Sequence, residues 1–94
     1  MNPSPSHEPV RYTREEMRAW MIDYVARLLG VDPGEVDPSG SFEHAGIDSS
    51  GAVGMSGDLE DLLGTQFETS LIYDHPSIDA LVDHLVSLRL VKAA

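Results

Sequence analysis

Two neighbouring serines, Ser49 and Ser50, stand directly after Asp48 at the predicted start of a helix. A hydroxyl in the first turn of a helix is exposed, and the helix dipole and the free N–H groups of that turn favour an anion beside it. A phosphodiester attached to Ser49 would therefore lie in a favourable electrostatic field. The same residues also fit a simpler interpretation, in which Ser49 or Asp48 only caps the helix.

Other kinds of chemistry find little support in the sequence. A serine hydrolase requires Gly-x-Ser-x-Gly on a strand-to-helix elbow, whereas Ile47 lies two residues before Ser49 and no strand is predicted there. The absence of Cys excludes a disulfide framework and a thiol nucleophile. The four histidines lack the close spacing of a helical metal site, so no metal site is predicted; they are His7, His44, His75 and His84.

The charge distribution indicates what kind of partner the surface fits. The chain has 16 acidic residues against 6 Lys and Arg, and neither Lys nor Arg occurs between Arg27 and Arg89. Such a surface repels phosphate backbones, which argues against nucleic-acid binding, and it attracts basic patches on proteins. A simpler interpretation is that the acidity only aids solubility.

No segment of the sequence predicts a membrane-bound or exported protein. No apolar run approaches the roughly 20 residues that span a bilayer. The first ten residues lack the basic patch and apolar block of a signal peptide. We therefore expect a cytoplasmic protein without a membrane partner.

Three amphipathic helices are predicted to position these residues. The first begins with the capping box Thr13 to Glu16 and ends at Gly30. The second runs from about Ser49 to Leu63 and stops at Gly64, and the last follows Ser77 as N-cap. On the second helix one face is apolar, with Ala52, Met55, Leu59, Leu62 and Leu63, and the other carries Ser50, Val53, Gly54, Gly57 and Asp61.

The remaining segments connect these helices. A short helical turn is predicted at about residues 70–73 and ends before Pro76, because a residue that precedes Pro is pushed out of the helical region. A long first loop, 30–48, is rich in turn-forming residues and has Val31, Val36 and Phe42 as its apolar anchors. Residues 1–12, with three prolines, and 92–94 are predicted to be tails around one folded domain, 13–91. The sequence thus predicts a small all-α up-and-down bundle of three long helices and one short helix.

Two segments carry a family resemblance. Residues 42–49, Phe-Glu-His-Ala-Gly-Ile-Asp-Ser, resemble the Gly-x-Asp-Ser attachment site of acyl carrier proteins. Residues 71–78, Leu-Ile-Tyr-Asp-His-Pro-Ser-Ile, resemble the Leu-Val-Phe-Asp-His-Pro-Thr signature of modular polyketide synthase carrier domains. The likeness spans roughly Met17 to Leu88, with further matches at Phe42, Val53, Leu59, Gly64, Leu81, His84 and Leu85.

The resemblance implies an acyl-carrier-like four-helix bundle that performs no catalysis itself. Ser49 matches the serine that receives 4'-phosphopantetheine from coenzyme A, and Asp48 matches the acid that helps partners dock. The terminal thiol of the arm then holds an acyl group as a thioester. The implied partners are a phosphopantetheinyl transferase, an acyl-loading enzyme (an acyltransferase or an acyl-AMP ligase) and a ketosynthase or other synthase domains. The isolated domain is expected to be a monomer.

The second helix departs from the family pattern. Ser50 replaces the usual Leu, Gly54 the usual Glu and Ser56 the usual Arg. We hypothesise that this bare face lets a partner enzyme approach closely, with Val53 as the apolar contact; sequence drift on a tolerant surface is the alternative. The predicted partner-recognition residues are Ser50, Val53, Gly54, Gly57, Asp58 and Asp61.

Two alternative functions remain open from the sequence. A peptidyl carrier domain of nonribosomal peptide synthesis is similar, but such domains more often have Gly-Gly-x-Ser at the attachment site. Asp48 and the segment Tyr73-Asp74-His75-Pro76 instead favour polyketide or fatty-acid biosynthesis. An acidic helical adaptor that is never modified is an alternative of a different class.

Overall fold

The computed structural model describes residues 11–93, which form helices and connecting segments without a strand. Most of the predicted N-terminal tail and Ala94 therefore lie outside the described residues. Tyr12 and Lys92 also fall in the predicted tails, and here they lie beside each other. The Lys92 N–H donates to the Tyr12 carbonyl at 2.9 Å, and the Arg14 N–H donates to the Lys92 carbonyl at 2.8 Å. These bonds join the start of the first helix to the C-terminal end of the described chain.

Helix α1 (Arg14–Leu29) begins and ends at the predicted signals. The Glu16 N–H donates to the Thr13 hydroxyl at 3.1 Å, and the Glu16 carboxylate accepts from the Thr13 N–H at 2.9 Å. This reciprocal pair satisfies two N–H groups that the first helical turn leaves without partners. At the other end Gly30 has φ = 71°, a left-handed conformation that Gly adopts without steric cost.

The long first loop contains two short helical segments that the sequence did not predict. A 3₁₀ helix, η2 (Pro33–Glu35), and a single-turn helix, α2 (Phe42–Ala45), lie within it. Ser41 caps α2 by accepting from the His44 N–H at 3.0 Å. Of the predicted anchors, Phe42 is buried and Val36 half-buried, but Val31 is 39% exposed and does not anchor the loop.

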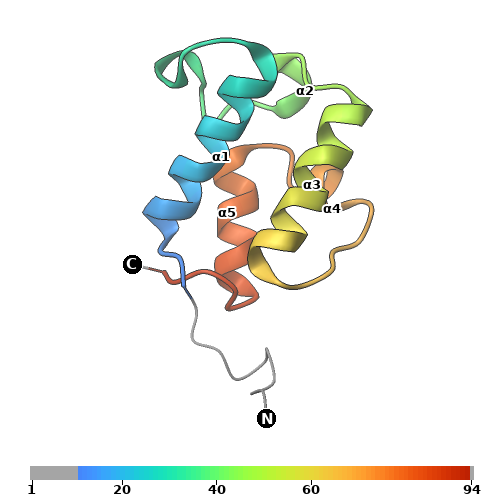
Figure 1. Cartoon of the computed structure of the whole chain (residues 1–94). Coiled ribbons are helices and arrows are strands. Elements are labelled where there is room, and N and C mark those ends of the chain that lie inside the picture. Colours follow the sequence, from blue (N-terminus) through green and yellow to red (C-terminus); the bar gives the residue numbers. More distant parts are fainter. Residues whose placement is uncertain (1–10, 94) are drawn as a thin grey trace.

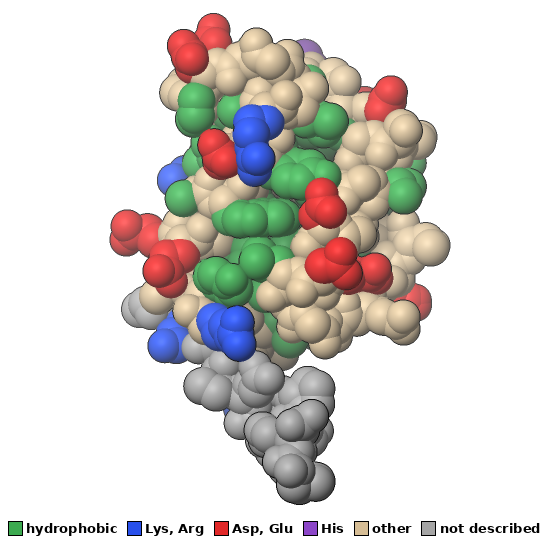
Figure 2. Space-filling view, viewed as in Figure 1, with side chains coloured by type: hydrophobic (Ala, Val, Ile, Leu, Met, Phe, Trp, Pro, Cys, Tyr) green, Lys and Arg blue, Asp and Glu red, His purple; other side chains and the backbone are tan. Residues whose placement is uncertain are grey.

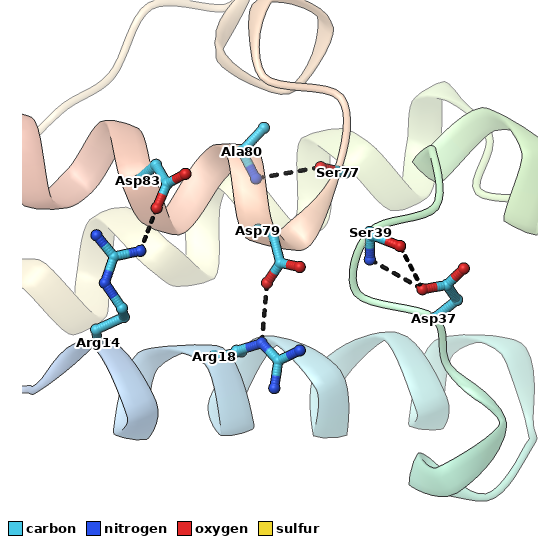
Figure 3. A network of polar contacts seen from close by, with 8 residues as sticks. All are labelled: Arg14, Arg18, Asp37, Ser39, Ser77, Asp79, Ala80 and Asp83. Carbon is cyan, nitrogen blue, oxygen red and sulfur yellow. Dashed lines mark hydrogen bonds and ion pairs between the residues drawn. The ribbon is translucent and has the colours of Figure 1, made fainter.

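Backbone hydrogen bonds tie this loop to the C-terminal part of the bundle. The Phe42 N–H donates to the Pro76 carbonyl at 2.7 Å, and the Asp79 N–H donates to the Pro38 carbonyl at 2.9 Å. Near the second of these bonds, the Ser39 N–H and hydroxyl both donate to Asp37, which lowers the pKa of that carboxyl (Figure 3). These bonds hold the long first loop against the segment before the last helix and against the first turn of that helix.

Helix α3 (Ser49–Leu63) has the predicted bounds. Ala52, Met55 and Leu59 of its predicted apolar face are buried, and Leu62 and Leu63 at its C-terminal end are half-buried. Gly64, with φ = 66°, ends the helix by donating its N–H to the Glu60 carbonyl. The predicted orientation of α3 is therefore confirmed.

The last two helices complete the bundle. Helix α4 (Leu71–Asp74) is the predicted short turn, and α5 (Ile78–Ser87) follows its cap Ser77, whose hydroxyl accepts from the Ala80 N–H at 3.1 Å. Figure 1 shows α5 between α1 and α3, with α4 beside α3. The predicted fold class is confirmed, with two short helical segments, η2 and α2, that the sequence did not indicate among the described residues.

The core lies where the apolar faces of the long helices meet. It is made by Met17, Met21, Val25, Phe42, Ala52, Met55, Leu59, Leu71, Ile72, Ile78, Leu81, Val82, Leu85 and Val91. At its edge two arginines of α1 reach carboxylates of α5: Arg14 pairs with Asp83, and Arg18 with Asp79 at 2.9 Å (Figure 3). No helix within residues 11–93 is long and apolar enough to cross a membrane.

Candidate functional site

At the N-terminal end of α3, one residue caps the helix and the next residue presents an exposed hydroxyl. Asp48 is the cap, because its carboxylate accepts a hydrogen bond from the Gly51 N–H at 2.9 Å. Ser49 is the first residue of the helix and is exposed. Of the two residues that could cap the helix, Asp48 does so, and the Ser49 hydroxyl is not needed for that purpose.

Tyr73 of α4 lies beside Ser49, although it comes 24 residues later in the chain. The Tyr73 hydroxyl is 3.4 Å from the Ser49 Oγ, and the Tyr73 side chain is 67% exposed. Leu71 and Ile72, the preceding residues of the same turn, are buried and fix α4 against the core. The Tyr-Asp-His-Pro segment is recognisable in the sequence, but the sequence did not predict that Tyr73 lies at the site. The signal that could have predicted this is that Tyr73 stands where the similar signature has phenylalanine.

The predicted partner-recognition residues all lie on α3. Ser50, Val53, Gly54, Asp58 and Asp61 are exposed, whereas Gly57 is half-buried. Val53 is the most exposed of the large apolar residues described, at 72%. Val53 and Tyr73 therefore present apolar surface to solvent on the two helices that meet beside Ser49.

Two of the glycines of α3, Gly51 and Gly54, lie closer to α1 than the sequence suggested. A methyl group added at Gly54 would lie 3.5 Å from the Tyr24 hydroxyl, and one at Gly51 only 2.9 Å from Leu28 Cδ2. At Gly57 the same methyl group would meet nothing within 4 Å. The face of α3 that was predicted to be bare is thus bordered by α1. Figure 2 shows a band of apolar side chains between α1 and α3, with acidic side chains along the α3 side.

Asp58 has a partner within the protein. The Tyr24 hydroxyl donates a hydrogen bond to the Asp58 carboxylate at 2.6 Å. Burial raises the pKa of Tyr24 to about 12, and the hydrogen bond and negative charge of Asp58 contribute to the same shift. The Asp58 carboxylate therefore joins α3 to α1, and it is also part of the exposed acidic surface of α3.

Two histidines form a second titratable pair in this part of the bundle. His75 ends α4, as the sequence predicted, and its ring stacks on His84 of α5 with the centroids 3.8 Å apart and the planes at 17°. Burial lowers the pKa of His84, the charge of His75 lowers it further, and Asp74 opposes both effects. Among residues 11–93 there is no group of three or more His, Cys, Asp or Glu residues that could hold a metal ion.

A pocket of about 390 Å³ opens elsewhere, between the C-terminal half of α1, the first loop and the start of α5. Its apolar lining includes Val25, Leu29, Phe42 and Ile78. Ser49 is not part of this lining, so the exposed hydroxyl stands on the surface and not in the pocket.

Comparison with known sequences identifies this arrangement. The family model described as "Phosphopantetheine attachment site" matches residues 19–85. The chain is 39% identical over 72 residues to a phenolphthiocerol/phthiocerol polyketide synthase of Mycobacterium tuberculosis, covering 77% of this chain and 4% of that protein. It is 31% identical over 85 residues to erythronolide synthase EryA3 of Saccharopolyspora erythraea, covering 88% of this chain and 3% of that protein. The chain thus spans only a small fraction of these relatives.

Solved structures have the same fold over nearly their whole length. A free-standing peptidyl carrier protein from an Acinetobacter baumannii secondary metabolic pathway is similar with a TM-score of 0.77 and 38% identity, covering 82% of this chain and 96% of that one. Asl1650, an acyl carrier protein from Anabaena sp. PCC 7120 with a variant phosphopantetheinylation-site sequence, has a TM-score of 0.76 and 34% identity, covering 88% and 97%. Both comparisons agree with the match of the family model.

Proposed function

Because the chain belongs to the phosphopantetheine attachment-site family of non-catalytic carriers, we propose that it holds acyl intermediates as thioesters on an arm attached to Ser49. The single observation that carries this assignment is the exposed Ser49 hydroxyl at the start of α3, with capping left to Asp48. The family attaches 4'-phosphopantetheine covalently, and the acyl group is held by the thiol of that arm. The chain itself has no Cys.

The residues at this position fit a serine-linked phosphodiester. Ser49 Oγ is accessible to a separate transferase, and it would form the new P–O bond to the pantetheine phosphate of coenzyme A. Its proton would pass to a base of the transferase, with adenosine 3',5'-bisphosphate as the leaving group. The dipole of α3 favours the resulting anion at the first turn, and the phenol of Tyr73 stands within 3.4 Å of Oγ.

Polyketide biosynthesis is the pathway that we propose for this carrier. Its support comes from the similarity to polyketide synthases, together with Asp48 and the Tyr73-Asp74-His75-Pro76 segment. Fatty-acid biosynthesis uses the same arm chemistry and stays part of the proposal. The similarity to a peptidyl carrier protein keeps peptide biosynthesis as a second candidate. Loading assays with acyl-activating and aminoacyl-activating enzymes would separate the two.

The proposed partners are those that a carrier of this class requires. They are a phosphopantetheinyl transferase, an acyl-loading enzyme (an acyltransferase or acyl-AMP ligase) and a ketosynthase or another synthase domain. The formal net charge of −10 supports docking of basic protein surfaces. We further propose that the isolated domain is monomeric and cytoplasmic.

Incubation with coenzyme A and a broad-specificity phosphopantetheinyl transferase tests the assignment. We expect the intact protein to gain the mass of one phosphopantetheine unit, Ser49→Ala to gain none, and Ser50→Ala to be modified like the wild type. No gain by the wild-type protein would reject a carrier function and favour an unmodified adaptor. A mass gain that persists in Ser49→Ala and is lost in Ser50→Ala would show that the arm is attached to Ser50, and it would reject the assignment to Ser49.

A further inference from the structure

Tyr73 is a large aromatic residue that the bundle holds on its surface instead of in its core. Its side chain is 67% exposed, whereas the neighbouring Leu71 and Ile72 are only 4% and 6% exposed. The two buried residues hold α4 in place, and the Tyr73 hydroxyl lies 3.4 Å from Ser49 Oγ. No hydrophobic gain accounts for this placement, because most of the ring remains in water.

The distance between the two hydroxyls leaves space for a further hydrogen-bonded group. A direct O–H···O hydrogen bond is about 2.5–3.0 Å long, so 3.4 Å is a loose contact for the unmodified serine. A phosphate esterified to Ser49 has its phosphorus bonded to Oγ and its non-bridging oxygens two bonds beyond Oγ. A donor that already lies this close to Oγ is within reach of such an oxygen.

A phosphodiester on Ser49 would be an anion in a segment of the chain that offers no Lys or Arg as a hydrogen-bond donor. The segment that carries both Ser49 and Tyr73 contains no Lys or Arg, and Arg27, the last basic residue before it, pairs with Asp23 at 3.1 Å. The Gly51 N–H already donates to Asp48. A phenol hydroxyl can donate to an anionic oxygen, and such charge-assisted bonds are roughly twice as strong as neutral ones.

From these observations we propose that Tyr73 is a positioning residue for the arm: its hydroxyl donates a hydrogen bond to the phosphodiester on Ser49 and holds the first part of the arm against α4. The proposal rests on attachment at Ser49. The signature that residues 71–78 resemble has Phe at this position, so the hydroxyl is an addition that this chain makes to the shared pattern.

The test compares loaded forms of the wild type, Tyr73→Phe and Tyr24→Phe. Tyr24→Phe is a matched control, because it removes a hydroxyl that bonds to Asp58 and not to Ser49. Mass spectrometry first confirms that each protein carries one arm, and thermal denaturation confirms that each is folded. ³¹P NMR of the phosphodiester then reports on the hydrogen bond, through its chemical shift, and on the mobility of the group, through its relaxation.

We expect Tyr73→Phe to load fully, to shift the ³¹P resonance and to give faster motion of the phosphodiester, while Tyr24→Phe matches the wild type. In protein labelled with [¹³Cζ]tyrosine, loading should move the Tyr73 resonance and leave that of Tyr24 in place. Unchanged ³¹P shift and relaxation in loaded Tyr73→Phe would overturn the proposal. Slower loading of Tyr73→Phe with an unchanged ³¹P signal would overturn it too, because Tyr73 would then contact the transferase. Failure of the wild type to load would instead reject the attachment itself.

Discussion

Asp48 and Ser49 are adjacent residues with different environments at the start of α3. The Asp48 carboxylate is bonded to the Gly51 N–H, whereas the Ser49 hydroxyl faces solvent with Tyr73 as its neighbour. A cap residue contributes stability, and an exposed hydroxyl is available for modification. The two contributions can therefore be changed separately by substitution.

Asp48 itself offers a direct test of this separation. We expect Asp48→Ala to lower the free energy of unfolding by about 1 kcal/mol, because the Gly51 N–H loses its acceptor. Asp48→Asn keeps an amide oxygen as the cap and should retain nearly full stability. If the Asp48 charge also recruits the transferase, Asp48→Asn should raise the KM for loading with little change in kcat. Urea denaturation and loading kinetics measure the two effects.

Two results would contradict the roles assigned to Asp48. Equal stability of Asp48→Ala and the wild type would contradict the cap assignment. Identical loading kinetics of Asp48→Asn and the wild type would show that the charge of Asp48 is not used for docking, and that its contribution is limited to the helix.

At the scale of elements, α3 is a helix with three glycines in its interior. Gly51, Gly54 and Gly57 each cost the helix about 1 kcal/mol relative to Ala. The buried residues Met55 and Leu59, both at 0% exposure, hold it in place. Tertiary packing thus compensates for a local sequence that is a weak helix former.

The space around each glycine predicts what an alanine would do there. Gly57→Ala should raise the free energy of unfolding by about 1 kcal/mol, because the added methyl group meets nothing within 4 Å. Gly54→Ala should gain nearly as much, since 3.5 Å from the Tyr24 hydroxyl is ordinary contact. Gly51→Ala should gain less, because Leu28 Cδ2 at 2.9 Å must move. Urea denaturation of the single variants provides the measurement, and three equal gains would contradict it.

The same variants test the hypothesis that partners approach α3 closely. We expect Gly54→Ala combined with Gly57→Ala to slow loading or acyl transfer although the fold is more stable. Gly34→Ala is a control, because it adds a methyl group in open space within η2, on the first loop. Transfer kinetics equal to those of the wild type would favour drift on a tolerant surface.

At the scale of the whole molecule, contacts between side chains from distant segments hold the short elements to the long ones. The stack of His75 on His84 joins the end of α4 to α5, and Tyr24 joins α1 to Asp58 on α3. Because α4 carries Tyr73, the stack also helps to hold one side of the candidate site.

The stack predicts a pH dependence of stability. The pKa of His84 is lowered in the folded state by burial and by His75. Between its ordinary value of 6.5 and the lowered value, the unfolded chain therefore binds a proton that the folded chain does not. The free energy of unfolding should therefore fall as the pH decreases from about 6.5 towards the lowered pKa of His84. We expect His84→Gln to reduce this fall, as measured by urea denaturation at several pH values.

His44→Gln serves as the control, because His44 is an exposed residue of α2 that is not part of the stack. A wild type whose stability does not change over this interval would contradict the prediction. So would a His44→Gln variant that loses the pH dependence as fully as His84→Gln.

The sequence by itself determined the features that depend on residues within a few positions of one another. The capping box at Thr13, the stop signals Gly30 and Gly64, and the cap at Ser77 set the ends of the long helices, because each acts within one helical turn. The motifs at residues 42–49 and 71–78 identified the family for the same reason, since each is a continuous run of residues.

Only the tertiary structure decided which distant residues meet. The Ser49–Tyr73 and His75–His84 pairs depend on where α4 packs against α3 and α5, and no spacing in the sequence encodes those positions. The single-turn helix α2 belongs with them, because the bond from its Phe42 N–H to the Pro76 carbonyl forms only in the assembled bundle. The closeness of Tyr24 on α1 to Gly54 on α3 was also decided by the tertiary structure, because it depends on how the two helices pack and not on the sequence of either helix alone.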